Sequence, residues 1–93
     1  MGHAIYARQK GEELAYFASE PQDIKARCLY QLLNAEEAYG KESGLGHEYE
    51  YETSILAAME RIAEDLEWTR ESNFLKEILW KANQDELVTI SFH

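Results

Sequence analysis

Acidic side chains concentrate in the middle of this chain, and they are the first residues that could do chemistry. The 93 residues hold 18 Asp and Glu against 9 Lys and Arg, a formal net charge of −9. Residues 42–67 supply −7 of that charge, because eight carboxylates there accompany one basic residue, Arg61. Carboxylates can bind cations, transfer protons or attract a basic protein, so the residues around them decide which chemistry applies.

A metal or catalytic site would need partners that the sequence does not place near these carboxylates. His47, Glu48, Tyr51 and Glu52 lie close together, but no second His or Cys accompanies them, so we expect no transition-metal site. The three histidines lack the neighbours of a triad or relay, and no serine sits in an elbow motif. The sequence therefore predicts no enzyme, no metal and no cofactor.

The glycine-rich stretch 40–47 is the other place where a ligand could bind. Gly40, Gly44 and Gly46 lack the preceding strand and the Gly-Lys-Ser/Thr ending of a phosphate loop, so we do not interpret them as one. A small ligand-binding or catalytic domain built around this loop remains a third and less favoured hypothesis. It requires Tyr39, Lys41 and His47 to converge on one pocket.

Four glutamates are spaced four, three and four residues apart, which would place them along one ridge of a helix ending near residue 70. Like charges at these spacings lower helix stability by about 0.2–0.5 kcal/mol per pair. The ridge is either a solvated face that keeps the protein soluble or a docking surface for a basic partner, and both interpretations stay open at this point; the docking surface is the one that would carry a function. Glu48, Glu50 and Glu52 would assist it. The ridge consists of Glu60, Glu64, Glu67 and Glu71.

Two tryptophans lie outside the apolar stripes of their predicted helices. On a helical wheel, Trp68 lies near the outward side, and Trp80 lies off the stripe of Phe74, Ile78 and Ala82. The two rings either bury each other in a secondary cluster or mark an interface, where tryptophan often dominates binding energy. A homodimer would use such an interface as well as a different partner would.

Composition predicts a single domain, residues 1–93, with 45% hydrophobic residues to fill one core. No stretch approaches the roughly 18 apolar residues of a membrane span, and no secretory signal is recognisable, so the predicted location is the cytoplasm. The acidic balance disfavours nucleic acid and membrane as partners. Cys28 falls among apolar residues, and we interpret it as a buried, inert thiol.

The N-terminal segment is typical of a β-hairpin. With Lys10 and Gly11 as a two-residue turn, Arg8 would face Glu13 and Ile5 would face Tyr16. A short helix over residues 12–18 is the alternative, because Glu, Leu and Ala favour helices.

Helical spacing governs most of the remaining chain. A first helix is predicted from about 20 to 39, starting at the cap Ser19. Its stripe would consist of Ile24, Cys28, Leu32, Ala35 and Tyr39, widened by Leu29 and Leu33. Residues 47–52 alternate like a strand, yet we assign them to a second helix running to about Arg70, because an apolar pattern at helical spacing continues from them. That pattern is Tyr51, Ile55, Ala58, Met59, Ile62 and Leu66.

After a break at Ser72 and Asn73, a third helix would present one apolar face, and a strand would close the fold. The helix face comprises Phe74, Leu75, Ile78, Leu79 and Ala82. In the strand over residues 86–92, Val88, Ile90 and Phe92 would face the core. The predicted fold class is α+β: a small antiparallel sheet, made of an N-terminal hairpin and a C-terminal strand, with about three helices packed on one face.

The functional hypothesis follows from charge and aromatic placement together. We expect a small acidic protein-binding module, of the inhibitor, antitoxin or immunity type, that masks a basic site on a protein partner. The alternative is a structural homo-oligomeric protein without catalytic activity, whose tryptophan surface closes a homodimer.

Overall fold

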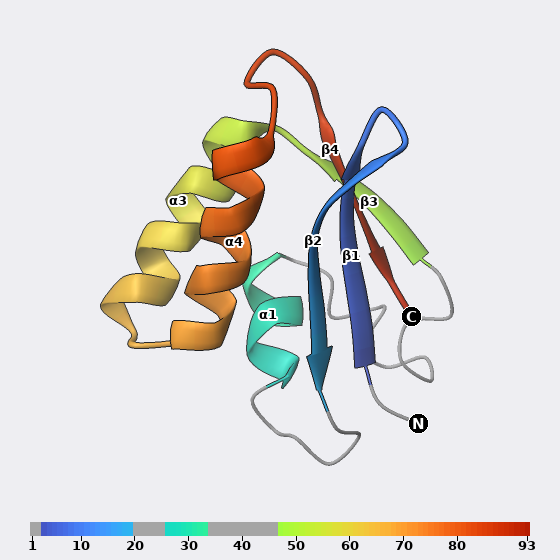
Figure 1. Cartoon of the computed structure of the whole chain (residues 1–93). Coiled ribbons are helices and arrows are strands. Elements are labelled where there is room, and N and C mark those ends of the chain that lie inside the picture. Colours follow the sequence, from blue (N-terminus) through green and yellow to red (C-terminus); the bar gives the residue numbers. More distant parts are fainter. Residues whose placement is uncertain (1–2, 20–25, 34–46) are drawn as a thin grey trace.

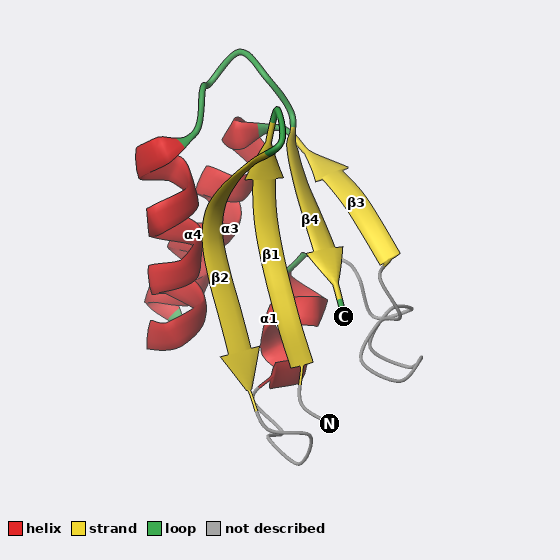
Figure 2. Cartoon of the chain, turned by 45° about the vertical axis from the view of Figure 1, so that its right-hand side comes forward, coloured by secondary structure: helices red, strands yellow, loops and turns green. Residues whose placement is uncertain are grey.

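The chain folds as a four-stranded antiparallel sheet with helices on one side (Figure 1). The computed structural model describes residues 3–19, 26–33 and 47–93. Figure 2 shows the described helices on one side of the sheet and none on the other. The predicted fold class is thereby confirmed. In chain order, the elements are β1 (His3–Gln9), β2 (Glu12–Ser19), α1 (Ala26–Leu32), β3 (His47–Tyr51), α3 (Thr53–Asp65), α4 (Thr69–Lys81) and β4 (Val88–Phe92).

The N-terminal hairpin is present, so the helical alternative for residues 12–18 is wrong. Lys10 and Gly11 both have positive φ, 51° and 80°. Positive φ at both central residues is required by the two-residue hairpin turn whose twist matches that of the flanking strands. Arg8 pairs with Glu13 as predicted. This pairing places opposite charges across from each other beside the turn.

A register shift beyond the turn corrects the second predicted pair. Ile5 pairs with Phe17, and Tyr6 pairs with Tyr16, because β2 carries one extra residue opposite the step between Ala7 and Arg8. Leu14 and Phe17 are three residues apart, so a regular strand would point them to opposite faces. The irregularity lets both side chains reach the core.

The C-terminal strand β4 forms the middle of the sheet, between β1 and β3, in the order β2-β1-β4-β3. Val88, Ile90 and Phe92 are fully buried, as predicted. The helical assignment of residues 47–51 is wrong: they form the edge strand β3, with Tyr49 opposite Ile90 and Tyr51 opposite Val88. The alternation of tyrosine and glutamate therefore describes a half-buried strand after all.

The helix boundaries also differ from the prediction. The second helix starts at Thr53 and ends at Asp65, and α4 runs through Ser72 and Asn73, where a break was expected. The predicted core stripe of the second helix is wrong too. Leu56 and Ala63 are its buried residues, whereas Ile55, Ile62 and Leu66 are about half exposed. The predicted apolar face of the third helix is confirmed, since Phe74, Leu75 and Ile78 are buried and Leu79 and Ala82 pack against them.

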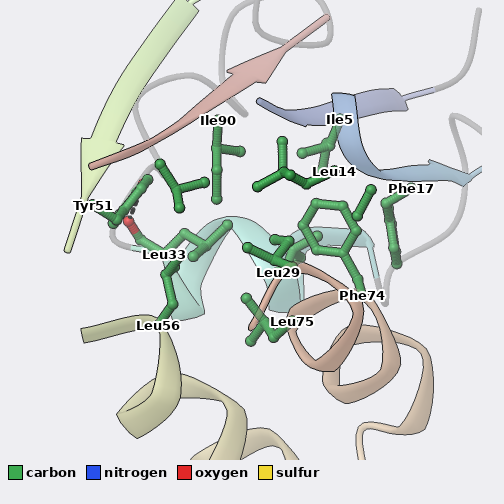
Figure 3. Packing of buried hydrophobic residues seen from close by; sticks show 14 of the residues in the cluster. Ile5, Leu14, Phe17, Leu29, Leu33, Tyr51, Leu56, Phe74, Leu75 and Ile90 are labelled. Atoms are coloured by element: carbon green, nitrogen blue, oxygen red, sulfur yellow. Dashed lines mark hydrogen bonds between the residues drawn. The ribbon is translucent and has the colours of Figure 1, made fainter. Parts of the chain in front are cut away.

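Side chains from the sheet and from all three described helices fill the core (Figure 3). From α1 and the residue after it come Leu29 and Leu33, which are almost completely buried. The remainder of the predicted 20–39 helix, including Ile24, Ala35 and Tyr39, and the side chain of Cys28, lie outside the described residues. The Tyr51 hydroxyl donates a 2.6 Å hydrogen bond to the Leu33 carbonyl oxygen. Burial, and secondarily Tyr49, raises the pKa of Tyr51 well above its ordinary value.

Two side chains, Gln9 and Lys10, tie the end of the hairpin to the loop between α4 and β4. The Gln9 amide nitrogen donates to the carbonyl oxygens of Asn83 and Glu86, at 2.9 and 3.2 Å. Its oxygen accepts a 2.7 Å hydrogen bond from the Asn83 backbone N–H. Lys10 adds a 2.9 Å ion pair to Glu86. These contacts fix the loop that borders one of the surface hollows described below.

Candidate functional site

The two long helices form a hairpin whose outer seam carries most of the residues of interest. Helices α3 and α4 lie side by side (Figure 1). Across the seam, the Ser72 hydroxyl donates a 3.1 Å hydrogen bond to Glu60, and Lys76 lies 3.6 Å from a Glu64 carboxylate oxygen. Each of these contacts joins one helix to the other. They set the relative position of the acidic side chains on α3 and the polar side chains on α4.

The connection between the helices is a Schellman motif with an unusual residue. The Trp68 N–H donates to the Ala63 carbonyl at 2.8 Å, and the Glu67 N–H donates to the Glu64 carbonyl at 3.1 Å. Glu67 occupies the left-handed position, with φ 61°, which glycine normally takes because it lacks a Cβ. Strained residues of this kind are concentrated at functional sites. The motif ends α3 and presents Glu67 and Trp68 at the tip of the helix hairpin.

A hollow of about 400 Å³ lies at this end of the seam. It brings together three predicted site residues, Glu64, Glu67 and Trp68. Sequence reasoning did not select the other lining residues, although the helical wheel of α4 places several of them on the solvent side with Trp80. These are Thr69, Ser72, Asn73 and Lys76.

Trp80 projects from the solvent side of α4, one helical turn beyond Lys76. It is 83% exposed, the most exposed large hydrophobic side chain in the described part of the chain. The interpretation in which Trp68 and Trp80 bury each other is wrong for this reason. Trp68, by contrast, is partly buried where α4 begins. The two rings thus border the same helix as separate features, one in a hollow and one free in solvent.

A second hollow, of about 720 Å³, lies at the opposite end of the seam. Its acidic rim includes Glu52, a predicted site residue, and Asp85. Leu79 and the half-exposed Leu87 supply apolar surface. The Thr53 hydroxyl donates a 3.2 Å hydrogen bond to the Gln84 carbonyl, which links the start of α3 to the loop after α4. No sequence pattern predicts this hollow, because the loop over residues 83–87 becomes a wall through long-range contacts with Gln9, Lys10 and Thr53.

Glu71 is not part of any exposed acidic ridge. The predicted ridge requires one continuous helix. In the structure, Glu60 and Glu64 belong to α3, Glu67 to the connection and Glu71 to α4. Glu71 is 3% exposed, and its Oε2 atom has no hydrogen-bond partner among the residues that the structure describes. A partner docking on the surface cannot reach this carboxylate without moving α4, so the prediction that it contacts a partner does not fit the structure.

Glu48 and Glu50 lie on a different side of the molecule from the helix hairpin. Both are exposed on β3, opposite Ser91 and Thr89, and point away from the side covered by helices. The same sheet face carries the contacting rings of Tyr6 and Tyr16, whose centroids are 4.9 Å apart and whose planes are tilted by 44°. These two glutamates therefore cannot act together with Glu64 and Glu67 on a single flat contact.

In residues 3–19, 26–33 and 47–93, no group of three or more His, Cys, Asp or Glu is placed to hold a metal ion. His47 starts β3, opposite Phe92. The proposed convergence of Tyr39, Lys41 and His47 falls mostly outside the described residues. Glu60, Glu64, Glu67, Trp68 and Trp80 on the helix hairpin remain the best candidate site.

Comparisons with known proteins add no functional information. No protein-family model matches the chain, and no curated protein or solved structure is significantly similar to it. Within the described ranges, no helix has the length and apolar character needed to cross a bilayer.

Proposed function

We propose that this chain is a small acidic protein-binding module that covers a basic site on a protein partner, in the manner of an inhibitor, antitoxin or immunity-type protein. The observation that carries the proposal is Trp80, which is 83% exposed near the end of α4, the helix whose beginning borders the hollow that contains Glu64 and Glu67. Leaving an indole in water forgoes its burial energy, and such rings are over-represented among the residues that dominate binding.

In this mechanism Trp80 is the apolar anchor and the tip of the helix hairpin supplies the charge. Glu64 and Glu67 are exposed and border the hollow beside Trp68. The hollow suits a Lys or Arg side chain of the partner, whose head would meet the two carboxylates while its stem lies against the Trp68 ring. Lys76 already pairs loosely with Glu64, so a partner's cation would have to compete with it. Glu67 is therefore the more available carboxylate.

The net charge of −9 acts at longer range. A strongly acidic surface accelerates encounter with a basic protein and discourages acidic ones, and this effect weakens as salt screens it. Association with the partner should therefore slow as ionic strength rises. The dissociation rate should depend mainly on the Trp80 contact.

Matched charge reversals on two faces of the molecule test the proposal. The tagged chain is used to capture partners from a lysate of its source cells, alongside three variants. Glu64→Lys with Glu67→Lys reverses charge at the helix tip, and Glu48→Lys with Glu50→Lys makes the same change in net charge on the open sheet face. Trp80→Ala removes the anchor. All four residues reversed are exposed, so each variant should fold, which circular dichroism verifies.

The proposal expects one basic protein to be retained by the parent chain and by the sheet-face variant, and lost from the helix-tip variant and from Trp80→Ala. Affinity of the purified pair should fall about 10-fold or more for each helix variant, equivalent to about 1.4 kcal/mol. Equal loss from both charge-reversed variants would indicate attraction by bulk charge rather than by this site. Retention by all variants would refute the proposed surface.

A further inference from the structure

A second surface of the helix hairpin is apolar and unrelated to the acidic seam. Ile55, Ile62 and Leu66 are 47%, 50% and 51% exposed. They fall on one side of α3, roughly a quarter-turn around the helix from its buried residues, Leu56 and Ala63. Met59, which is partly buried, and the exposed Ala58 lie between them on the same side. We call these five residues the α3 stripe.

The stripe is unusual because it contains no charged residue in a chain so rich in carboxylates. The acidic residues Glu60 and Glu64 of the same helix turn toward α4, where they contact Ser72 and Lys76. A basic partner would therefore find no complementary charge within the stripe. A surface of exposed aliphatic side chains in a row calls for an equally apolar surface against it.

We infer that the α3 stripe is a self-association surface through which two copies of this chain pair their α3 helices in antiparallel orientation. Ile55, Met59, Ile62 and Leu66 are spaced four, three and four residues apart, a pattern that reads the same in both directions. A two-fold axis near the middle of the helix places Ile55 opposite Leu66 of the second copy. The same axis places Met59 opposite Ile62 of the second copy. Every large apolar side chain of the stripe then meets another.

The size of the stripe determines how tightly the copies can associate. Ile55 to Leu66 spans about 16 Å along a helix, and a standard stable interface buries about 800 Å² on each partner. A single helix face of this length falls short of that area. The dimer is therefore weak and in exchange with the monomer, with a dissociation constant in the micromolar range or above.

Because of the net charge, the salt dependence of this dimer is opposite to that of the proposed partner complex. Both copies carry a net charge of −9, so they repel each other and only apolar burial holds them together. Added salt screens this repulsion and strengthens the dimer, whereas it weakens binding to a basic protein. The self-association does not depend on the proposed function, and either can fail without the other.

Sedimentation equilibrium of the full chain over a wide dilution series, at low and high salt, tests the inference. The parent chain should show a concentration-dependent dimer whose dissociation constant falls as salt is added. Ile62→Gln and Leu66→Gln should each raise that constant about 10-fold. Trp80→Ala, which removes a larger apolar side chain from the solvent side of α4, is the matched control and should leave the constant unchanged. Thermal unfolding verifies that all three variants fold.

A disulfide experiment tests the antiparallel register. In a Cys28→Ser background, a copy carrying Ile55→Cys should cross-link faster to a copy carrying Leu66→Cys than to another Ile55→Cys copy, and a parallel pair would reverse that order. A chain that stays monomeric at every concentration and salt overturns the inference. So does a dimer that is lost in Trp80→Ala but persists in Ile62→Gln.

Discussion

Gln9 offers a direct test of how the loop beside the larger hollow is held. Its side chain is 9% exposed and makes three hydrogen bonds to the backbone of residues 83 and 86, which are more than 70 positions away in sequence. Gln9→Met keeps the length of the side chain and removes all three bonds. Asn83 and Glu86 would then turn toward water or remain unpaired.

The expected loss can be worked from the bonds themselves. A hydrogen bond of this kind contributes about 0.5–1.5 kcal/mol net, so three together contribute about 3 kcal/mol. The loop is partly exposed, so water recovers some of the loss, and the methionine side chain gains some apolar burial. We expect Gln9→Met to lower the free energy of unfolding by about 2 kcal/mol, which for a domain of this size lowers Tm by about 8–16 °C.

Urea unfolding followed by tryptophan fluorescence and circular dichroism measures this loss. The matched control is Gln31→Met, the same substitution at an exposed position of α1, which should change stability by less than about 0.5 kcal/mol. The m-value should stay the same in both variants if only the folded state is affected. A loss in Gln9→Met no larger than that in the control would refute the idea that this side chain holds the loop.

Two further predictions concern a buried phenol and a strained cap. Because burial raises the pKa of Tyr51, the folded state keeps that proton while the unfolded state releases it above about pH 10, so stability should fall there by up to about 1.4 kcal/mol per pH unit. Tyr51→Phe should lower the free energy of unfolding by about 1 kcal/mol at neutral pH, because the hydrogen bond to Leu33 is lost. Its free energy of unfolding, measured in urea, should nevertheless decline less steeply above about pH 10 than that of the parent chain. An equally steep decline would contradict the assignment to Tyr51. Glu67→Gly, at φ 61°, should stabilise the protein by about 0.5–1 kcal/mol while weakening partner binding. A loss of stability would show that Glu67 is not strained.

The elements predicted best were those with strong local signals. Lys10-Gly11 marks a two-residue turn, and the alternation around Val88, Ile90 and Phe92 marks a core strand, so both ends of the chain were placed correctly. The strand over residues 47–51 was missed because Tyr51 fits two patterns at once. It ends an alternating strand and also stands four residues before Ile55, at helical spacing. A single sequence does not reveal which neighbour Tyr51 packs against.

The candidate site was predicted less well than the fold, because its position depends on tertiary packing. The break at Leu66–Trp68 rests on Glu67 in a conformation that glycine usually adopts, so no sequence signal marked it. Because the helix break lies at Leu66–Trp68 and not at Ser72 and Asn73, Glu71 belongs to α4 and its side chain is buried. Likewise, Ile55 and Ile62 fit a core stripe by spacing alone, but the packing of α3 against α4 selects Leu56 and Ala63 instead.

The position of β4 has a consequence for how the chain folds as it is made. This inner strand follows the other described strands in sequence, so β1 and β3 lack their shared neighbour until residues 88–92 have left the ribosome. The hairpin can form early because its contacts are local, but closing the sheet joins segments more than 80 residues apart and should be slow. During that delay β1 has an open edge that could pair with another chain. The repulsion between copies that each carry a charge of −9 would then guard against aggregation before the fold is complete.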